Sequence, residues 1–381
     1  MTDSNHTQKR NLHIIHDDKF TDGAIEQFEK YYPGQNIYVV LLNDGNKLKF
    51  TTANSLLSIY QIRSTDLKKN IQDTIRSHGV KNLFIHYLDN FKAGISDKIL
   101  SLFSLKFYWV FYGGDLYSYL QQYCGYQILD EPSKISKPSL LHCLKYVLWF
   151  GSTPKQIMLK ALRRVDYFCF WNEYDFELYQ SHFKSHAMFK PFIYYNALGN
   201  PDVQAAEKEN IILVNHSASP SGNHGHILRL LSELRFKRTG YQLLLPLSYG
   251  DQQYADKIVA ESVTLFGDKV DVLRDFIPLK EYQEKLAKVK IAIFGMKRQE
   301  AAGNIFQLLN MGAKVFLREE NTLLKWLRNR DFIVYSVEKD LQDIQQIAML
   351  SDKEIAHNQE RYHKYFNTDV YNDIMTNLIE E

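Results

Sequence analysis

The chain has 381 residues, of which 45% are hydrophobic and 24% charged, a composition typical of globular proteins. Because this length exceeds what one hydrophobic core usually serves, two domains are expected. The formal net charge is only +2, so no global field favours nucleic acid, which we exclude as a partner. Three cysteines without metal-type spacing indicate a reduced, cytoplasmic compartment, and no stretch approaches the ~20 apolar residues of a membrane span.

Apolar runs alternate with amphipathic patterns along the first half of the chain. Predicted strands cover residues 12–16, 37–42, 82–87, 107–112 and 167–171. Helical patterns lie between them, for example at 22–32 and 96–105. Short apolar runs that alternate with helices indicate a parallel sheet buried on both faces.

A polar, turn-rich stretch at 196–210 interrupts this alternation and predicts a linker. Behind it, strands are expected at 211–215, 242–246, 270–273, 291–294, 314–317 and 332–336, with helices at 224–237, 252–266, 279–287 and from 304. We therefore expect an α/β fold of two Rossmann-like parallel-sheet domains, at 1–198 and 210–351, and terminal helices at 352–381. The carboxyl ends of the two sheets would face a central cleft, the default ligand site.

The stretch that follows the predicted strand at 291–294 has the order of an anion site. Lys297 and Arg298 supply positive charge, Gln299 and Asn304 can donate neutral hydrogen bonds, and Gly303 lets the backbone approach a ligand. The next helix would add unpaired backbone N–H groups at its start. The alternative is an ordinary strand–helix turn with solvated charges.

A second polar loop follows the strand at 211–215. Asn215 ends that strand, and Ser217 and Ser219 begin a hydroxyl-rich loop that could present donors to a phosphate or a sugar. Three histidines in this loop raise the question of zinc, but no cysteine or carboxylate stands beside them, so we expect no metal site and no cofactor. These histidines are His216, His224 and His226.

The first domain offers candidates for a general base. Asp115 follows an apolar strand and two glycines, so it either faces the cleft as a base or caps the next helix. His86 ends the strand at 82–87 and is either a structural histidine or a second candidate. Asp17 and Asp18, after the first strand, carry the same ambiguity.

Residues 132–165 contain seven basic residues and no acidic one, interleaved with leucines and aromatic residues around Trp149 and Phe150. Such a segment suits an anionic membrane surface. The alternative is a helical pair that packs on the first domain and leaves a solvated basic face.

The chain contains neither G-x-G-x-x-G after a strand nor G-x-x-x-x-G-K-[ST], which argues against a dinucleotide dehydrogenase and a P-loop NTPase. Four blocks, "FYWVFYGGDLY", "ILVNHSASPSGNHGHILRLL", "PLSYGD" and "RQEAAGNIFQLLNMGAKVFLREEN", occur in an order that resembles a known family. This is the TDP-N-acetylfucosamine:lipid II N-acetylfucosaminyltransferase family, whose members are 4-alpha-L-fucosyltransferase-like enzymes with the GT-B fold.

The resemblance implies a metal-independent glycosyltransferase of surface polysaccharide synthesis. The second domain would hold the nucleotide-diphosphate sugar, such as dTDP-N-acetylfucosamine, and the first a polyprenyl-diphosphate-linked acceptor. By position, the donor would contact residues at and after the end of the predicted strand at 211–215, and a loop after the strand at 242–246. The diphosphate would lie against the start of the helix predicted from 304. The implied donor residues are Asn215, Ser217, Ser219, Tyr249 and Gly250, and those at the diphosphate are Gln299, Gly303 and Asn304.

Two positions depart from better-known GT-B enzymes. Their strand-end His-Gly-x-Asp motif reads Tyr112-Gly-Gly-Asp115 here, and Gln307 stands where a second glutamate often binds ribose. A lipid-linked acceptor would place the protein on the inner face of the cell membrane as a peripheral protein. The rival interpretations are a nucleotide-sugar epimerase of the same fold and a non-catalytic nucleotide-sugar-binding protein.

Overall fold

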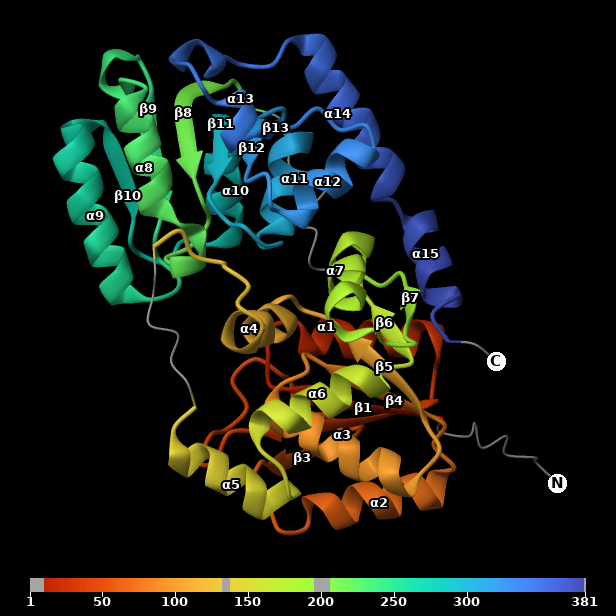
Figure 1. Ribbon diagram of the computed structural model, residues 1–381. Helices are drawn as coiled ribbons and strands as arrows, with labels where there is room; N and C mark the ends of the chain where they lie inside the picture. Colours follow the sequence, from red (N-terminus) through yellow and green to blue (C-terminus); the bar gives the residue numbers. More distant parts are fainter. Residues whose placement is uncertain (1–9, 132–137, 195–205, 380–381) are drawn as a thin grey trace. The chain divides into compact units, whose positions relative to one another are not determined.

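The computed structural model describes residues 10–131, 138–194 and 206–379, and the chain folds into two compact units (Figure 1). Unit 1 comprises Met1–Tyr126, Ile135–Asn196 and Tyr371–Glu381, and unit 2 comprises Gln127–Lys134 and Ala197–Val370. The expected terminal segment at 352–381 is therefore divided between the units, and a short segment ahead of α5 belongs to unit 2.

In the described part of unit 1, seven parallel strands lie in the order β3-β2-β1-β4-β5-β6-β7. The elements are β1 (Asn11–His16), α1 (Thr21–Tyr31), β2 (Asn36–Leu42), β3 (Leu57–Gln61), α2 (Leu67–His78), β4 (Asn82–His86), α3 (Asn90–Leu102), β5 (Lys106–Val110), α4 (Gly114–Tyr123), α5 (Leu140–Phe150), α6 (Pro154–Arg164), β6 (Tyr167–Cys169), α7 (Glu173–Phe183) and β7 (Met188–Lys190).

In the described part of unit 2, six parallel strands lie in the order β10-β9-β8-β11-β12-β13. The elements are β8 (Glu209–Val214), α8 (His224–Glu233), β9 (Gln242–Pro246), α9 (Gln252–Phe266), β10 (Val270–Leu273), α10 (Leu279–Lys288), β11 (Val289–Phe294), α11 (Ala302–Asn310), β12 (Lys314–Leu317), α12 (Thr322–Asn329), β13 (Tyr335–Ser336), α13 (Val337–Asp340), α14 (Asp352–Tyr365) and α15 (Thr368–Thr376).

Aromatic rings form a continuous ladder across the sheet of unit 1. The rungs come from five neighbouring strands and are Tyr38, His13, Phe84, Tyr108 and Tyr167, which pair in register along the sheet. Successive ring centroids are 4.4–4.9 Å apart. Because stacked rings bury large areas on a pleated surface, this ladder stabilises the sheet of unit 1.

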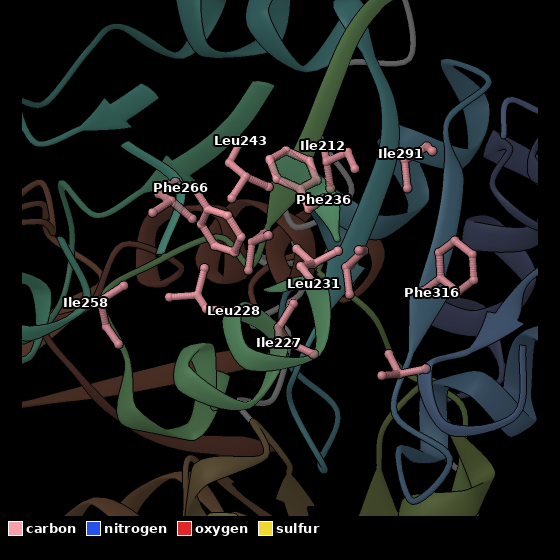
Figure 2. Packing of buried hydrophobic residues seen from close by; sticks show 14 of the residues in the cluster. Ile212, Ile227, Leu228, Leu231, Phe236, Leu243, Ile258, Phe266, Ile291 and Phe316 are labelled. Carbon is pink, nitrogen blue, oxygen red and sulfur yellow. The ribbon is translucent and has the colours of Figure 1, made fainter. Parts of the chain in front are cut away.

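The core of unit 2 lies where α8 and α9 cover one face of the sheet (Figure 2). Every second residue of β8, β9 and β11 points into it, including Ile212, Leu243 and Ile291, which are fully buried. Ile227 of α8 and Ile258 of α9 face these strands (Figure 2). The alternation follows from the two-residue period of a strand. Because these strands are parallel, their carboxyl ends lie at one edge of the sheet.

The expectation of two parallel α/β sheets is confirmed. Strands β3 and β7 were not predicted; both are edge strands whose residues are half-buried or exposed, so they lack the apolar run of a central strand. Helix α3 begins at Asn90, six residues earlier than the pattern at 96–105, and Asp89 is its N-cap. Helix α11 begins at Ala302 rather than at Asn304.

Candidate functional site

Asn215 joins two of the loops at the carboxyl edge of the unit 2 sheet. It is fully buried with φ of 58°, and its backbone N–H donates to Ile293 O at 3.0 Å. Its side-chain amide donates to Gly222 O at 2.9 Å, and its Oδ1 accepts from Gly295 N at 2.8 Å. The polar groups of Asn215 therefore face other backbone groups, and the residue fixes the β8 and β11 loops to each other.

Asn223 makes a second connection between these loops, which the sequence analysis did not assign. Its Nδ2 donates to Gly295 O and to Ile128 O, each at 3.0 Å, and its Oδ1 accepts from Asp130 N at 2.9 Å. The loops approach so closely that a Cβ on Gly295 would lie 2.2 Å from Gly222 O. A side chain at position 295 would force these loops apart.

The loop that follows β9 is attached to the same edge. Ala218 N donates to Tyr249 O at 2.7 Å, and Asp251 N donates to Ala218 O at 2.9 Å. Gly250 has φ of 116°, and a Cβ there would lie 2.5 Å from Ala218 O, so the turn requires glycine. The side chain of Tyr249 beside it is 69% exposed and reaches the surface.

The two predicted donor serines differ in accessibility. Ser217 is buried, and its hydroxyl lies 3.4 Å from His216 Nε2. Ser219 is half-buried, and its hydroxyl lies 2.7 Å from that of Ser221. Ser219 and Ser221 thus form the accessible hydroxyl pair of this loop.

The amino end of α11 has the features of an anion site. Its N-cap, Ala301, adopts a left-handed conformation with φ of 59° and makes no side-chain capping hydrogen bond. Gly303 and Asn304 lie in the first turn, are half-buried, and carry backbone N–H groups without a partner inside the helix. Gln299, just before this turn, is 8% exposed. Such an end favours a phosphate or a carboxylate.

Both basic residues ahead of α11 are paired within unit 2. Lys297 Nζ lies 2.8 Å from Asp130 Oδ1 and 3.7 Å from Glu320 Oε1. An Arg298 guanidinium nitrogen lies 2.6 Å from Glu300 Oε1. Their positive charge is therefore balanced by carboxylates, and an anion at α11 would depend mainly on backbone donors.

Asp130 lies at the centre of an ion cluster that the sequence did not reveal. The Arg318 side chain, 5% exposed, donates to both oxygens of Asp130, at 2.5 and 3.1 Å, and also pairs with Glu338. Burial alone would raise the pKa of Asp130, but the hydrogen bonds from Arg318 and Lys297 outweigh it and lower that pKa to about 2. Asp130 precedes α5 and Arg318 follows β12, so the two residues are far apart in the sequence. The local sequence pattern around either residue therefore does not predict that they pair.

In unit 1, Asp115 is buried at the start of α4, with 4% exposure. One carboxylate oxygen accepts from Trp109 Nε1 at 2.8 Å and from Leu88 N at 3.1 Å, and the other accepts from Tyr112 N at 3.3 Å. Gly113, not Asp115, is the N-cap of the helix. Burial raises the pKa of Asp115 to about 6, although these donors oppose the shift.

His86 is inside the aromatic core, with 1% exposure. Its Nε2 lies 3.1 Å from His13 Nδ1, and its Nδ1 lies 2.5 Å from the Tyr194 hydroxyl. Burial first, then the charges of His13 and Lys92, lower the pKa of His86 well below its usual range. His86 is therefore a neutral, hydrogen-bonded member of the core.

Asp17 and Asp18 lie at the half-buried end of β1 and differ in their partners. The Asp17 carboxylate accepts from the backbone N–H groups of Lys49 and Thr51, at 2.6 and 2.8 Å, and so holds the loop after β2. Asp18 Oδ1 accepts from Phe20 N at 3.1 Å, a local turn contact. Asp17 and Asp18 are the two half-buried members of the four predicted acid–base candidates. Of these two, only Asp18 has a carboxylate that does not hold a distant segment.

A neighbouring histidine and lysine were missed by the sequence analysis. His16 Nε2 lies 2.5 Å from Asp89 Oδ2 and its Nδ1 lies 3.2 Å from Leu41 O, so both ring nitrogens face acceptors. Lys92 is completely buried and donates to His86 O. Burial lowers the pKa of Lys92 to about 8, while the carboxylates of Asp89, Asp115 and Asp18 oppose that shift.

The histidines of the β8 loop have different neighbours. His224 is buried, and its Nδ1 lies 3.2 Å from the Tyr254 hydroxyl. His226 Nδ1 lies 3.7 Å from Asp130. Among the residues that the structure describes, no group of three or more His, Cys, Asp or Glu side chains is arranged to hold a metal ion.

Of the basic segment at 132–165, residues 132–137 lie outside the described residues. The rest forms α5 and α6, and α5 buries Tyr146 and Phe150 while its leucines face solvent. Within the described ranges, no helix is both long and apolar enough to cross a membrane.

Comparison with protein families gives a match to the family described as 4-alpha-L-fucosyltransferase, glycosyl transferase group 56, over residues 169–379. The match covers more than half of the chain and includes the strands and helices of unit 2. No curated protein sequence matches the chain significantly.

Several solved structures share the fold over nearly the whole chain. Sucrose-phosphate synthase from Thermosynechococcus elongatus is 11% identical, with a TM-score of 0.64 and coverage of 96% of both chains. A glycosyltransferase from Rickettsia africae is 11% identical, with a TM-score of 0.55 and coverage of 97% of this chain and 100% of the other. An E. coli protein described as trehalose-6-phosphate bound with UDP-2-fluoro glucose is 9% identical, with a TM-score of 0.55 and coverage of 96% of both chains. These similarities confirm the GT-B fold.

Proposed function

Because the chain belongs to the 4-alpha-L-fucosyltransferase family, glycosyl transferase group 56, we propose that this glycosyltransferase uses dTDP-N-acetylfucosamine or a closely related deoxy-sugar donor. Its acceptor is a polyprenyl-diphosphate-linked glycan of surface polysaccharide synthesis, at the inner face of the cell membrane. The observation that carries the proposal is the family match, which extends across the unit that holds the candidate anion site.

The donor diphosphate binds at the amino end of α11. The uncapped first turn with Gly303 and Asn304 supports this assignment, because it offers backbone N–H groups to an anion. Gln299 adds a neutral donor, and Lys297 and Arg298 contribute charge that their carboxylate partners reduce. As the sugar–phosphate bond breaks, the same donors stabilise the growing charge on the leaving diphosphate.

The β8 and β9 loops surround the rest of the donor. Of the residues in these loops implied by the family resemblance, Ser219 is half-buried and Tyr249 and Gly250 are exposed, so these three are accessible. Buried Asn215 and Ser217 lie behind this surface, and Asn215 connects the β8 and β11 loops, while Gly250 lets the β9 loop approach Ala218. A donor-binding surface whose loops are fixed in advance loses less conformational entropy when the ligand binds.

Asp115 is our proposal for the general base on the acceptor side. A pKa of about 6 suits a group that takes a proton near neutral pH. Its three hydrogen-bond donors hold the carboxylate in one position, and the half-buried Asp18 is the alternative candidate for the base. His86 is the second catalytic candidate that the sequence offers, and its burial in the core weakens it.

A transfer assay tests the proposal. The full chain is incubated with dTDP-N-acetylfucosamine and with UDP- and dTDP-linked hexoses, each with and without a polyprenyl-diphosphate-linked glycan extract. A lipid-linked product and nucleoside diphosphate should appear together and only when donor and acceptor are both present. Turnover of donor alone to an isomer would identify an epimerase. Donor binding without any turnover would identify a non-catalytic protein, and either result would overturn the proposal.

A further inference from the structure

We propose that α5 docks unit 1 on an anionic lipid bilayer, with a leucine stripe of the helix inserted at the boundary between headgroups and hydrocarbon. The inference rests on the proposed function only for its purpose, since a polyprenyl-linked acceptor lies in a membrane. The proposed contact is one face of α5 and not the whole basic segment at 132–165. The structure decides which side chains of that segment face outward.

The outward face of α5 is apolar along its entire length. Five side chains form this leucine stripe, and their exposed fractions run from 41% to 86%. They recur at the spacings of one helix face, i, i+1, i+4, i+7 and i+8. The stripe consists of Leu140, Leu141, Leu144, Val147 and Leu148. Single exposed leucines are ordinary, but a complete apolar face directed to solvent marks an interaction surface.

The inner face of α5 is held firmly, so the stripe is presented on a fixed helix. Tyr146 and Phe150 are buried, and Trp149 meets Phe91 edge to face at 5.9 Å. A Cβ on Gly94 of α3 would lie 2.7 Å from the Phe150 ring, so glycine at this position lets the helices approach closely. Trp149 and Phe150 thus anchor the helix to the protein instead of entering lipid.

Both ends of the helix are terminated by side-chain or backbone caps. Ser139 accepts a hydrogen bond from His142 N at 3.2 Å, and Gly151 ends the helix in a left-handed conformation. Helix α5 has 11 residues, about 16 Å at the usual rise, which is half of a ~30 Å hydrocarbon core. It can therefore lie in the plane of a bilayer surface but cannot span it.

Positive charge flanks the stripe. Lys145 Nζ lies 4.2 Å from the centre of the Trp149 ring. Lys68 Nζ donates to Trp149 O at 3.1 Å and lies 4.8 Å from the centre of the Phe150 ring. The described residues of the segment, 138–165, include no carboxylate side chain. An apolar face with lysines beside it matches an anionic lipid surface.

The same charges argue against a second copy of the chain as the occupant. A symmetric contact through the stripe would bring the lysines that flank the stripe in one copy to the same interface as those of the other copy. Like charges opposite one another disfavour such an interface, whereas anionic headgroups would neutralise both lysines. An anionic bilayer is therefore the occupant to which we commit.

Vesicle sedimentation with the full chain tests the docking. The combined variant L141Q/L144Q/L148Q removes the centre of the stripe at exposed positions, so folding should be unaffected. Binding to mixed phosphatidylglycerol and phosphatidylcholine vesicles should fall by ~10² or more, since each buried leucine contributes substantially. The matched control L102Q/V263Q/L279Q changes exposed apolar residues elsewhere and should bind like the wild type.

Salt and lipid composition separate the electrostatic contribution to binding from the apolar contribution. High salt and pure phosphatidylcholine should each weaken binding without abolishing it, because the apolar contact is not screened. Equal binding of wild type and L141Q/L144Q/L148Q would overturn the proposal. Absence of vesicle binding by the wild type would also overturn the proposal. This includes the case in which the stripe forms a concentration-dependent dimer instead.

A third measurement separates docking from the proposed function. With a short-chain, water-soluble acceptor, L141Q/L144Q/L148Q should transfer sugar as fast as the wild type, while transfer to acceptor in vesicles should fall with binding. Equal transfer by both proteins to acceptor in vesicles would overturn the docking role. If neither protein transfers sugar to any acceptor, the proposed function fails, and the sedimentation result still decides whether α5 docks.

Discussion

Lys297 Nζ lies 2.8 Å from the carboxylate of Asp130, a residue that precedes α5 in the sequence yet belongs to unit 2. The order of residues after the predicted strand at 291–294 predicts a lysine charge that is available to a diphosphate. In the structure this charge is largely neutralised, and the Arg298 charge is neutralised by Glu300. The proposed anion binding at α11 would therefore depend on backbone and amide donors more than on net positive charge.

Asn304→Ala and Arg298→Ala test the diphosphate site. Affinity for the nucleoside diphosphate should fall by ~10-fold or more in Asn304→Ala, because a hydrogen bond to a charged group is lost. The loss should be smaller in Arg298→Ala, whose charge is already paired. Isothermal titration measures both, with Lys237→Ala on the surface of unit 2 as the control. Unchanged affinity in both variants would make the stretch a structural turn.

Asp130→Asn should destabilise unit 2. The folded-state pKa of about 2 lies below the ordinary value of 3.8, so the ionised carboxylate contributes stability above pH 4 that is lost as pH falls toward 2. The variant should lose on the order of 2 kcal/mol at neutral pH by this shift and should not show the acid-dependent loss. Denaturant unfolding at several pH values measures this. Wild-type stability in Asp130→Asn at pH 7 would contradict it.

Asp115→Asn and Asp18→Asn distinguish the two candidate bases. The variant that removes the base should lower kcat/KM by ~10²–10⁴ with donor affinity intact, while the other variant should change it little. If Asp115 is the base, wild-type kcat/KM should rise through pH 6, where its carboxyl ionises, and Asp115→Asn should lack this rise. Asp17→Asn is the matched structural control, because that carboxylate holds the 49–51 loop. Full activity in both Asp115→Asn and Asp18→Asn would exclude both residues as the base.

The burial of Asp115 also predicts a pH-dependent stability. Its folded-state pKa of about 6 exceeds the ordinary 3.8, so stability is full below pH 4 and falls as pH rises through 6. The loss is on the order of 3 kcal/mol for this one group. Asp115→Asn cannot ionise, and the difference in free energy of unfolding between it and the wild type should therefore change between pH 4 and pH 7. A constant difference would show that Asp115 keeps an ordinary pKa.

Gly295→Ala should disturb the carboxyl edge of unit 2 without removing any polar group. Its Cβ would lie 2.2 Å from Gly222 O, so the β8 and β11 loops must separate. A loss of ~1–3 kcal/mol in stability is expected, as for other overpacked positions, together with weaker donor binding. Gly240→Ala, where the nearest atom is 3.7 Å away, is the control. Normal donor affinity in Gly295→Ala would show that the loop connection is not needed for binding.

The sequence by itself determined the layout of the two sheets. Central strands such as β2 and β9 are apolar on both faces, and their runs alternate with helical periods, so their positions follow from local patterns. The polar loops after β8 and β11 could be found for the same reason, because a polar stretch directly after a buried strand must lie at its carboxyl edge. Edge strands β3 and β7 lack that apolar signal and were not predicted.

Only the tertiary structure decided what the polar residues at those edges do. Asn215 accepts a hydrogen bond from Gly295, Asp115 accepts one from Leu88, and Asp130 pairs with Arg318, all through contacts between segments distant in sequence. The direction of the α5 leucines was likewise set by which side of the helix packs on Gly94. Local patterns fix the period of an element, but the partner of a side chain depends on which other segment the fold brings within a few ångströms.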